Sequence, residues 1–167
     1  MVESTISRLQ KAGIPRDKWP QDLHWDWDKK ADWSRRFLSL QRFAITCCGA
    51  LQGLMLVNLT KLSARIASQW GKDLAYIDYL STAPWNRPEI AGVQQFHGVG
   101  KIMVRAAIQV SLDEGFRGRL GLHALGQATS FYRNVCGMTD LGTDNDYYNL
   151  TYFEMTESQA KAFCGET

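Results

Sequence analysis

Apolar residues recur along this chain at two spacings, every three to four residues in some segments and every second residue or in short runs in others. The first spacing predicts helices and the second predicts strands. The clearest helix is expected over 100–114, where four apolar residues share one face: Met103, Ala106, Ala107 and Val110. Caps and stop signals predict shorter helices over 4–12, 126–134 and 157–163, and a longer Trp-rich helical stretch over 20–37.

Runs rich in β-branched, aromatic and apolar residues predict the strands. Residues 41–48 and 54–59 flank a Gly49–Gly53 link, which is typical of an antiparallel hairpin. Further strands are expected over 74–82, 119–125 and 147–155. A hairpin followed by alternating strands and helices predicts the α/β class, with a mixed sheet flanked by helices.

Length and composition indicate one globular domain. The chain has 167 residues and 45% hydrophobic residues, and we assign it to a single domain, 1–167. Within it, 1–38 is a helical, Trp-rich N-terminal segment and 40–155 is the core. A net charge of only +2 gives no support for nucleic-acid binding.

The sequence gives no sign of export, membrane insertion or metal binding. Residues 1–10 carry Glu3 and Arg8 and no apolar run, and Leu54–Val57 is the longest apolar stretch. We therefore expect a soluble cytoplasmic protein without a membrane partner. The four cysteines form no CxxC pair, so we expect reduced, mostly buried thiols and no metal site.

The segment Gln95–Lys101 is the candidate for anion binding. Its two glycines, Gly98 and Gly100, precede the long helix, so backbone N–H groups and the positive end of the helix dipole converge on one spot. A Gly-x-Gly pair alone is more often a tight turn. Position 103 is Met, which excludes the dinucleotide fingerprint, and no Gly-Lys-Ser/Thr sequence is present for a Walker loop.

Three motifs make the segment more specific. Gln95-x-x-Gly98-x-Gly100 resembles the Q/R-x-x-G-x-G/A signature of the GNAT (Gcn5-related) N-acetyltransferases. Residues 79–84 resemble the strand that holds the pantetheine arm in that family, and 128–138 resembles its A-x-x-F-Y-x-x-x-G-F segment. The pieces occur in the family's order over about 40–155. Leu125 departs from the family's frequent Asn at that place.

The resemblance implies a fold in which two central parallel strands splay apart and acetyl-CoA sits between them as cosubstrate. It implies that the pyrophosphate meets backbone N–H groups of 98–101 and that pantetheine pairs with the strand near Leu80 and Thr82. The cofactor-binding residues it implies are Leu80, Ser81, Thr82, Gln95, Phe96, His97, Gly98, Val99, Gly100, Lys101 and Phe131.

In such a fold, a neutral amine attacks the thioester directly, and coenzyme A leaves as a thiolate. Tyr132 matches the family's tyrosine acid that protonates the sulfur. For the base, two residues stay open beside a chain of waters. Asp78 is expected in phase with Leu80 and Thr82 on the cofactor strand, and His123 lies near the end of the next strand. Each is equally explained as a structurally paired side chain.

The resulting hypothesis is an acetyl-CoA-dependent N-acetyltransferase acting on a primary amine, with a small-molecule or peptide acceptor. The alternatives are a non-catalytic acyl-CoA-binding or regulatory module on the same fold, and an unrelated nucleotide-binding α/β protein. The oligomeric state stays open, a homodimer included. Several residues would form an acidic, aromatic surface suited to a cation, or simply a core and a solvated face: Trp25, Asp26, Trp27, Asp28 and Trp85.

Overall fold

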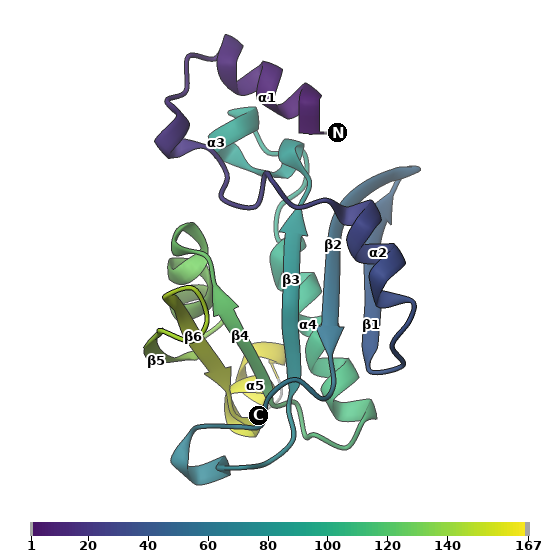
Figure 1. Cartoon of the computed structure of the whole chain (residues 1–167), viewed down its shortest axis with the longest axis vertical. Coiled ribbons are helices and arrows are strands. Elements are labelled where there is room, and N and C mark those ends of the chain that lie inside the picture. The colour runs from purple at the N-terminus through teal and green to yellow at the C-terminus, as the bar shows by residue number, and fades with distance from the viewer. Residues whose placement is uncertain (1, 166–167) are drawn as a thin grey trace.

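The computed structural model describes residues 2–165, so Met1 and 166–167 of the expected domain lie outside the described residues (Figure 1). Its centre is a six-stranded sheet in the order β1-β2-β3-β4-β6-β5. The strands are β1 (Leu40–Cys47), β2 (Ala50–Asn58), β3 (Ala75–Thr82), β4 (Leu120–Ala124), β5 (Thr139–Asp144) and β6 (Leu150–Met155). Only β3 and β4 pair in parallel among these neighbours, which confirms the expected mixed sheet.

The helices are α1 (Val2–Lys11), α2 (Trp27–Ser34), α3 (Pro88–Ala91), α4 (Val99–Asp113) and α5 (Glu157–Cys164). In the view of Figure 1, α4 lies behind the sheet and α2 lies in front of β1 and β2. Within residues 2–165, none of these helices combines the length and the apolar character needed to cross a bilayer.

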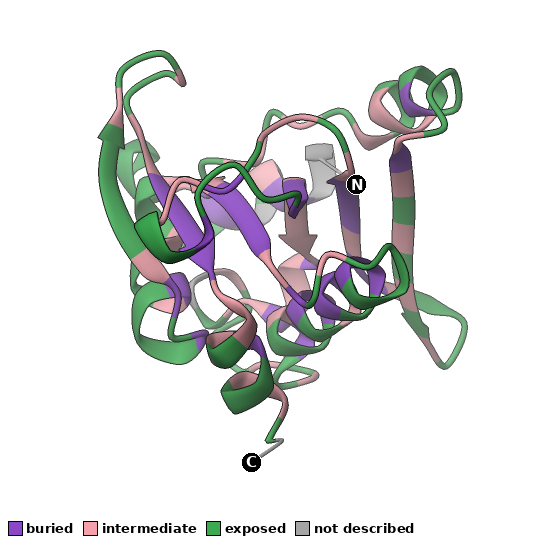
Figure 2. Cartoon of the chain, turned by 90° about the horizontal axis from the view of Figure 1, so that it is seen from below, coloured by how far each residue is buried: buried purple, intermediate pink, exposed green. Residues whose placement is uncertain are grey.

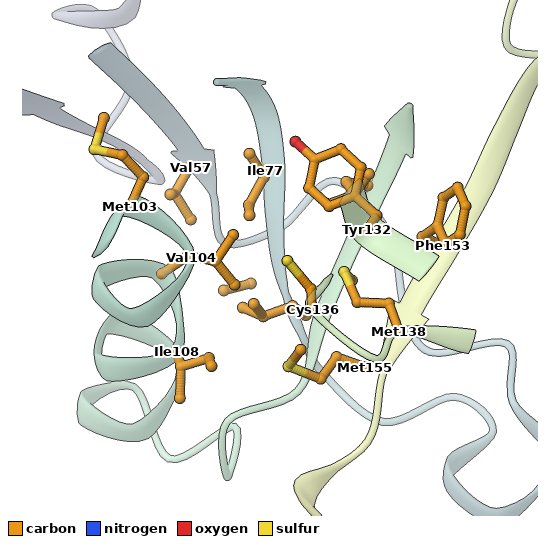
Figure 3. Packing of buried hydrophobic residues seen from close by; sticks show 14 of the residues in the cluster. Val57, Ile77, Met103, Val104, Ile108, Tyr132, Cys136, Met138, Phe153 and Met155 are labelled. Carbon is orange, nitrogen blue, oxygen red and sulfur yellow. The ribbon is translucent and has the colours of Figure 1, made fainter. Parts of the chain in front are cut away.

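The main core lies between α4 and one face of the sheet. Met103, Ala107 and Val110 are buried there and Ala106 packs against them, which confirms the predicted apolar face of this helix; Val104 is buried as well. They pack with sheet residues such as Val57 and Ile77 (Figure 3). Figure 2 shows the same division, with buried positions on the central strands and on the inner side of the helices.

β3 and β4 are paired only at their beginnings. The parallel register joins Ala75–Ile77 to Leu120–Leu122, and beyond that point the two strands diverge (Figure 1). At the far end of β3, Ala83 donates its N–H to Gln52 O on the β2 side. Because successive residues of a strand direct their backbone groups to opposite edges, Leu80 and Thr82 direct theirs into the open splay.

A β-bulge at Asp78 changes which residues share a face of β3. Leu56 pairs with Tyr79 and Val57 pairs with Ile77, so Asp78 is the extra residue. Leu80 packs against the core on the α4 side, whereas Asp78 bonds to Lys61 and Asn58 instead. The expectation that Asp78 is in phase with Leu80 and Thr82 is therefore wrong, because the bulge shifts the alternation by one residue.

Other departures from the sequence predictions concern irregular backbone. Residues 20–26 are not helical, since α2 begins only after Asp26, whose side chain accepts from Lys29 N. The predicted helix over 126–134 is a short 3-10 turn followed by a π-helical turn over Phe131–Val135. The edge strand β5 was not predicted. Of the four thiols only Cys136 is buried, so the expectation of mostly buried cysteines is wrong.

A buried carboxylate holds the long 60–73 connection against the sheet. Glu154 of β6 is fully buried and accepts hydrogen bonds from Arg65 N at 2.6 Å and Ile66 N at 3.0 Å. Gln69 Nε2 donates to the same side chain at 2.7 Å. This cluster satisfies backbone groups that the connection would otherwise bury without partners.

Glu154→Ala is expected to lower the free energy of unfolding by about 2–5 kcal/mol, because these three donors and the Tyr152 hydroxyl lose a buried acceptor. Urea unfolding measures the loss, and hydrogen exchange should show reduced protection at the amides of Arg65 and Ile66. Glu157→Ala is the matched control, since this partly exposed carboxylate pairs with Lys161 on the surface and should change stability by under about 0.5 kcal/mol. Equal losses for the two variants would contradict the structural role.

Candidate active site

A first cavity, of about 540 Å³, opens beside the N-terminus of α4, between this helix, β3 and the 125–132 segment. Its lining includes the four residues at the start of the helix: Gly98, Val99, Gly100 and Lys101. The free N–H groups of the first helical turn and the Lys101 side chain make this end of the cavity suited to an anion.

The backbone at Gly98 and Gly100 has a conformation or a close contact that favours glycine. Gly98 caps α4 with a left-handed φ of +76°, and a Cβ at this position would meet no atom within 4 Å. Gly100 lies under the Phe131 ring, where a Cβ would approach Phe131 Cζ to 3.1 Å. The first glycine leaves open space beside the helix N-terminus, and the second lets an aromatic ring close over the backbone.

The 84–96 loop forms the mouth of the first cavity and is pinned by buried polar contacts. Asn86 Nδ2 donates to Gln52 Oε1 at 2.9 Å, and Asn86 Oδ1 accepts from Phe96 N at 3.0 Å. Trp85 Nε1 donates to the same Gln52 oxygen at 2.9 Å. The loop's position is thus fixed by β2, although its sequence shows no regular pattern.

An ion pair joins this loop to the N-terminal segment. Arg87 contacts both carboxylate oxygens of Asp22, and the Ser81 hydroxyl donates to Asp22 Oδ2 at 2.7 Å. Burial opposes ionisation of Asp22, but its bonds to Arg87 and Ser81 hold its pKa below the ordinary value. Arg87 Nε also donates to Thr82 O at 2.9 Å, at the open edge of β3.

The structure brings most of the predicted cofactor-binding residues to this cavity and leaves three outside its lining. Those that line it are Leu80, Thr82, Phe96, Gly98, Val99, Gly100, Lys101 and Phe131. Ser81 faces Asp22 and a neighbouring hollow instead. Gln95 and His97 are exposed, and Gln95 uses its backbone N–H to bond Trp85 O at 2.9 Å.

A second cavity, of about 460 Å³, lies on the face of the sheet opposite α4 and is rich in aromatic rings. Its aromatic lining residues are Trp25, Tyr76, Tyr79, Tyr132, Tyr147 and Tyr148. Trp25 packs edge-on against Tyr79, and Lys30 Nζ lies 3.5 Å from the Tyr79 ring centroid. Of the five residues of the expected acidic, aromatic surface only Trp25 lines this cavity, and Trp85 lies apart, bonded to Gln52.

The two cavities meet where β3 and β4 diverge, because four residues line both: Leu80, Leu125, Ala128 and Tyr132. Tyr132 belongs to the π-helical turn, which is closed by Cys136 N donating to Phe131 O. In Figure 3 its hydroxyl points away from Met138, toward the side of β3 where Ile77 lies. Burial raises the pKa of this phenol, so it keeps its proton at neutral pH.

Asp78 and His123 both line the second cavity, but each is already engaged. The carboxylate of Asp78 contacts Lys61 and accepts from Asn58 Nδ2 at 3.2 Å. His123 bonds through both ring nitrogens, one to Tyr76 and the other to Asp144. Both ring nitrogens of His123 thus have partners, and so does each carboxylate oxygen of Asp78.

Sequence reasoning did not single out Tyr76 or Asp144. Tyr76 is 47 residues from His123, and Asp144 ends an edge strand that the hydrophobic pattern did not reveal. Strand alternation was the one signal that could have found Tyr76, since it lies two residues before Asp78, which the sequence did single out.

The thiol nearest to Tyr132 is not a nucleophile at neutral pH. Cys136 is buried in the core cluster, and burial raises its pKa to about 12. Among residues 2–165, no three or more His, Cys, Asp and Glu side chains cluster in a way that would hold a metal ion.

Comparison with known proteins identifies the fold. No protein-family model matches the sequence, and no curated protein matches it. A bacterial toxin superposes with a TM-score of 0.62 at 14% identity, over 88% of this chain and 82% of that one. A GNAT-family acetyltransferase from Listeria monocytogenes superposes with a TM-score of 0.56 at 15% identity, over 92% and 84%. This chain has the fold of the GNAT acetyltransferases.

A Bacillus subtilis acetyltransferase in complex with CoA shares this GNAT fold, with a TM-score of 0.51 at 14% identity, over 77% of this chain and 84% of that one. The fold implied by the three motifs is thus confirmed, including the splayed parallel strands. At these identities the likeness establishes the architecture, and the chemistry has to be argued from the site itself.

Proposed function

We propose that this chain is an acetyl-CoA-dependent N-acetyltransferase that moves the acetyl group directly to a primary amine. The observation that carries the proposal is the meeting of the two cavities at the splay of β3 and β4. A thioester held in the first cavity would present its carbonyl at the junction. An amine in the second cavity would then attack from the opposite face of the sheet.

The first cavity supports acetyl-CoA on two grounds. The N-terminus of α4, the open backbone at Gly98 and the Lys101 side chain suit a pyrophosphate. The backbone groups of Leu80 and Thr82 face the open edge of β3, where an extended pantetheine arm would add like a further strand. Gln95 and His97 would serve through the loop's shape, and Ser81 through its hydrogen bond to Asp22.

At the junction, Tyr132 would donate the proton that departing coenzyme A needs. Its hydroxyl belongs to a residue that lines both cavities, and its raised pKa keeps the proton in place until a thiolate forms. The acceptor would be a small-molecule or peptide amine, bound among the aromatic rings of the second cavity.

Calorimetry with acetyl-CoA, ATP and NAD tests the proposal. We expect acetyl-CoA to bind at least about 10-fold more tightly than either nucleotide, because only its pantetheine arm pairs with β3. An acetyl-CoA consumption screen would follow with amino acids, polyamines, aminoglycosides and lysine peptides. Equal affinity for all three ligands would contradict the proposal, whereas tight acetyl-CoA binding without turnover of any amine would favour the non-catalytic acyl-CoA-binding module.

A further inference from the structure

A continuous chain of hydrogen bonds crosses three strands on the face of the sheet opposite α4. Tyr76 Oη of β3 lies 2.6 Å from His123 Nδ1 of β4, and His123 Nε2 lies 3.0 Å from Asp144 Oδ2 at the end of β5. Arg65 Nη1 donates to the same Asp144 oxygen at 2.6 Å. The His123 ring also stacks on Tyr147, with centroids 4.1 Å apart and planes within 7°.

The chemistry of these groups fixes the direction of each bond. Hydrogen bonds from Arg65 and His123 lower the pKa of Asp144 to about 2, so at neutral pH this carboxylate only accepts. Nε2 of His123 must therefore carry the hydrogen and donate it to Asp144. Nδ1 is left as a bare acceptor, and the Tyr76 hydroxyl donates to it.

Of the side chains in this chain of bonds, Tyr76 is the one through which an amine in the second cavity can reach His123. The His123 side chain and Tyr76 are equally buried, at 3% exposure each, but both ring nitrogens of His123 are occupied. Tyr76 also lines the cavity, and its hydroxyl gives its hydrogen to His123 Nδ1. A lone pair of Tyr76 Oη is therefore left to accept from an amine, whereas both ring nitrogens of His123 already have partners.

We propose that Tyr76 is a catalytic residue that takes a proton from the acceptor amine while passing its own hydroxyl proton to His123. Asp144 is then a positioning residue, because it holds the imidazole in the tautomer that leaves Nδ1 free to accept. This assignment rests on the proposed acetyl transfer, and it replaces both Asp78 and direct action of His123 as the base.

The protons balance as follows. An ammonium N–H bond breaks as an O–H bond forms at Tyr76, and the original Tyr76 O–H bond breaks as an N–H bond forms at His123 Nδ1. The neutral amine attacks the thioester carbonyl, and the C–S bond breaks. As the adduct collapses, the Tyr132 O–H bond breaks and an S–H bond forms on coenzyme A, and the second proton leaves nitrogen and restores the Tyr132 hydroxyl. His123 later returns its proton to water by the same route.

The charges around His123 fit a base that is neutral at rest. Burial lowers the pKa of the imidazole, and this outweighs the Asp144 carboxylate, which raises it. The imidazolium that forms during transfer would bond to Asp144 and lie against the Tyr147 ring. The charged and titratable groups that face Tyr76 and His123 are Lys61, Arg65, Asp78, Asp144, Tyr147, Tyr152 and, through Tyr152, Glu154.

The test compares phenethylamine, largely an ammonium at neutral pH, with 2,2-difluoro-2-phenylethylamine, whose fluorines leave the amine mostly uncharged. Tyr76→Phe and His123→Gln should each lower kcat/KM for phenethylamine by about 100-fold or more, and for the fluorinated amine much less. Asp144→Asn should also move the acidic limb of the kcat/KM profile to lower pH, because the imidazole loses the carboxylate that raises its pKa.

Tyr152→Phe is the matched control. Its buried hydroxyl bonds Glu154 at 3.2 Å while its ring lies 4.8 Å from His123, so this variant should keep both rates. Equal losses on the two amines in Tyr76→Phe, or an equal loss in Tyr152→Phe, would overturn the relay. Nitrogen-15 histidine NMR adds an arm that needs no acceptor, since an Nδ1-protonated His123 in the parent would also overturn it. Failure to bind acetyl-CoA would instead overturn the proposed function.

Discussion

Tyr132→Phe is expected to lower turnover by about 10- to 1,000-fold with near-normal acetyl-CoA affinity. The substitution removes only the hydroxyl of a residue that lines both cavities. The ring keeps its contacts with Phe131 and Phe153, whose centroids lie 5.2 and 6.0 Å away. Because burial raises the pKa of the phenol, Tyr132 is a proton donor throughout the neutral range.

Stopped-flow measurement of the acetyl-transfer step, with calorimetry of acetyl-CoA binding alongside, checks this expectation. Tyr76→Phe and Tyr132→Phe should also differ in which of the two amines they slow. Tyr76→Phe spares an amine that is already neutral, whereas Tyr132→Phe slows both amines alike, because the leaving group is the same. A phenylalanine variant as fast as the parent, with chemistry shown to be rate-limiting, would point to water as the proton source.

The sequence was most informative where a local signal carries the structure. The apolar face of α4 follows from helical spacing, and the turn before it follows from Gly98 and Gly100. Both signals come from residues within one element, so no knowledge of tertiary contacts was needed. The motifs then added the splay of β3 and β4, which spacing alone does not predict.

The faces of β3 were not predictable, because a bulge has no signature in the order of residues. Period-two reasoning placed Asp78 with Leu80 and Thr82, yet one extra residue relative to β2 shifts the alternation. The partners of Asp78 come from outside its strand: Asn58 ends β2, and Lys61 belongs to the connection between β2 and β3. Its use as an ion-pair partner was visible only in three dimensions.

The irregular segments were missed for a different reason. Residues 20–26 contain two aspartates, Asp22 and Asp26, and nothing local shows that Asp26 is the one that caps α2. β5 is a polar, mostly exposed edge strand, so it lacks the apolar alternation by which strands are recognised. Since β5 ends on Asp144, missing this strand also meant missing the group that orients His123.

Gly98→Ala is expected to weaken acetyl-CoA binding by about 10- to 100-fold, the equivalent of one charge-assisted hydrogen bond of about 1.5–3 kcal/mol. Gly98 lines the first cavity, and a Cβ there would enter open space beside the helix N-terminus. The methyl group would meet no protein atom within 4 Å, so any loss of affinity comes from the ligand side and from backbone strain.

A matched control separates those two causes. Gly71 has almost the same φ, +72° against +76°, and a Cβ there also meets nothing, but it lies in a surface turn that does not line the cavity. Gly71→Ala and Gly98→Ala should therefore lose similar melting temperature, since alanine at positive φ costs about 1 kcal/mol or more at either place. Calorimetry should show a loss of acetyl-CoA affinity in Gly98→Ala alone.

Gly100→Val provides an independent test at the same loop. Its Cβ would push against the Phe131 ring, which lines the same cavity, so affinity should fall by displacement of that ring. If both Gly98→Ala and Gly100→Val fold and bind acetyl-CoA like the parent, the pyrophosphate does not lie at the N-terminus of α4. The cofactor would then have to be held by β3 alone, and the resemblance of 95–101 to the family signature would not reflect binding.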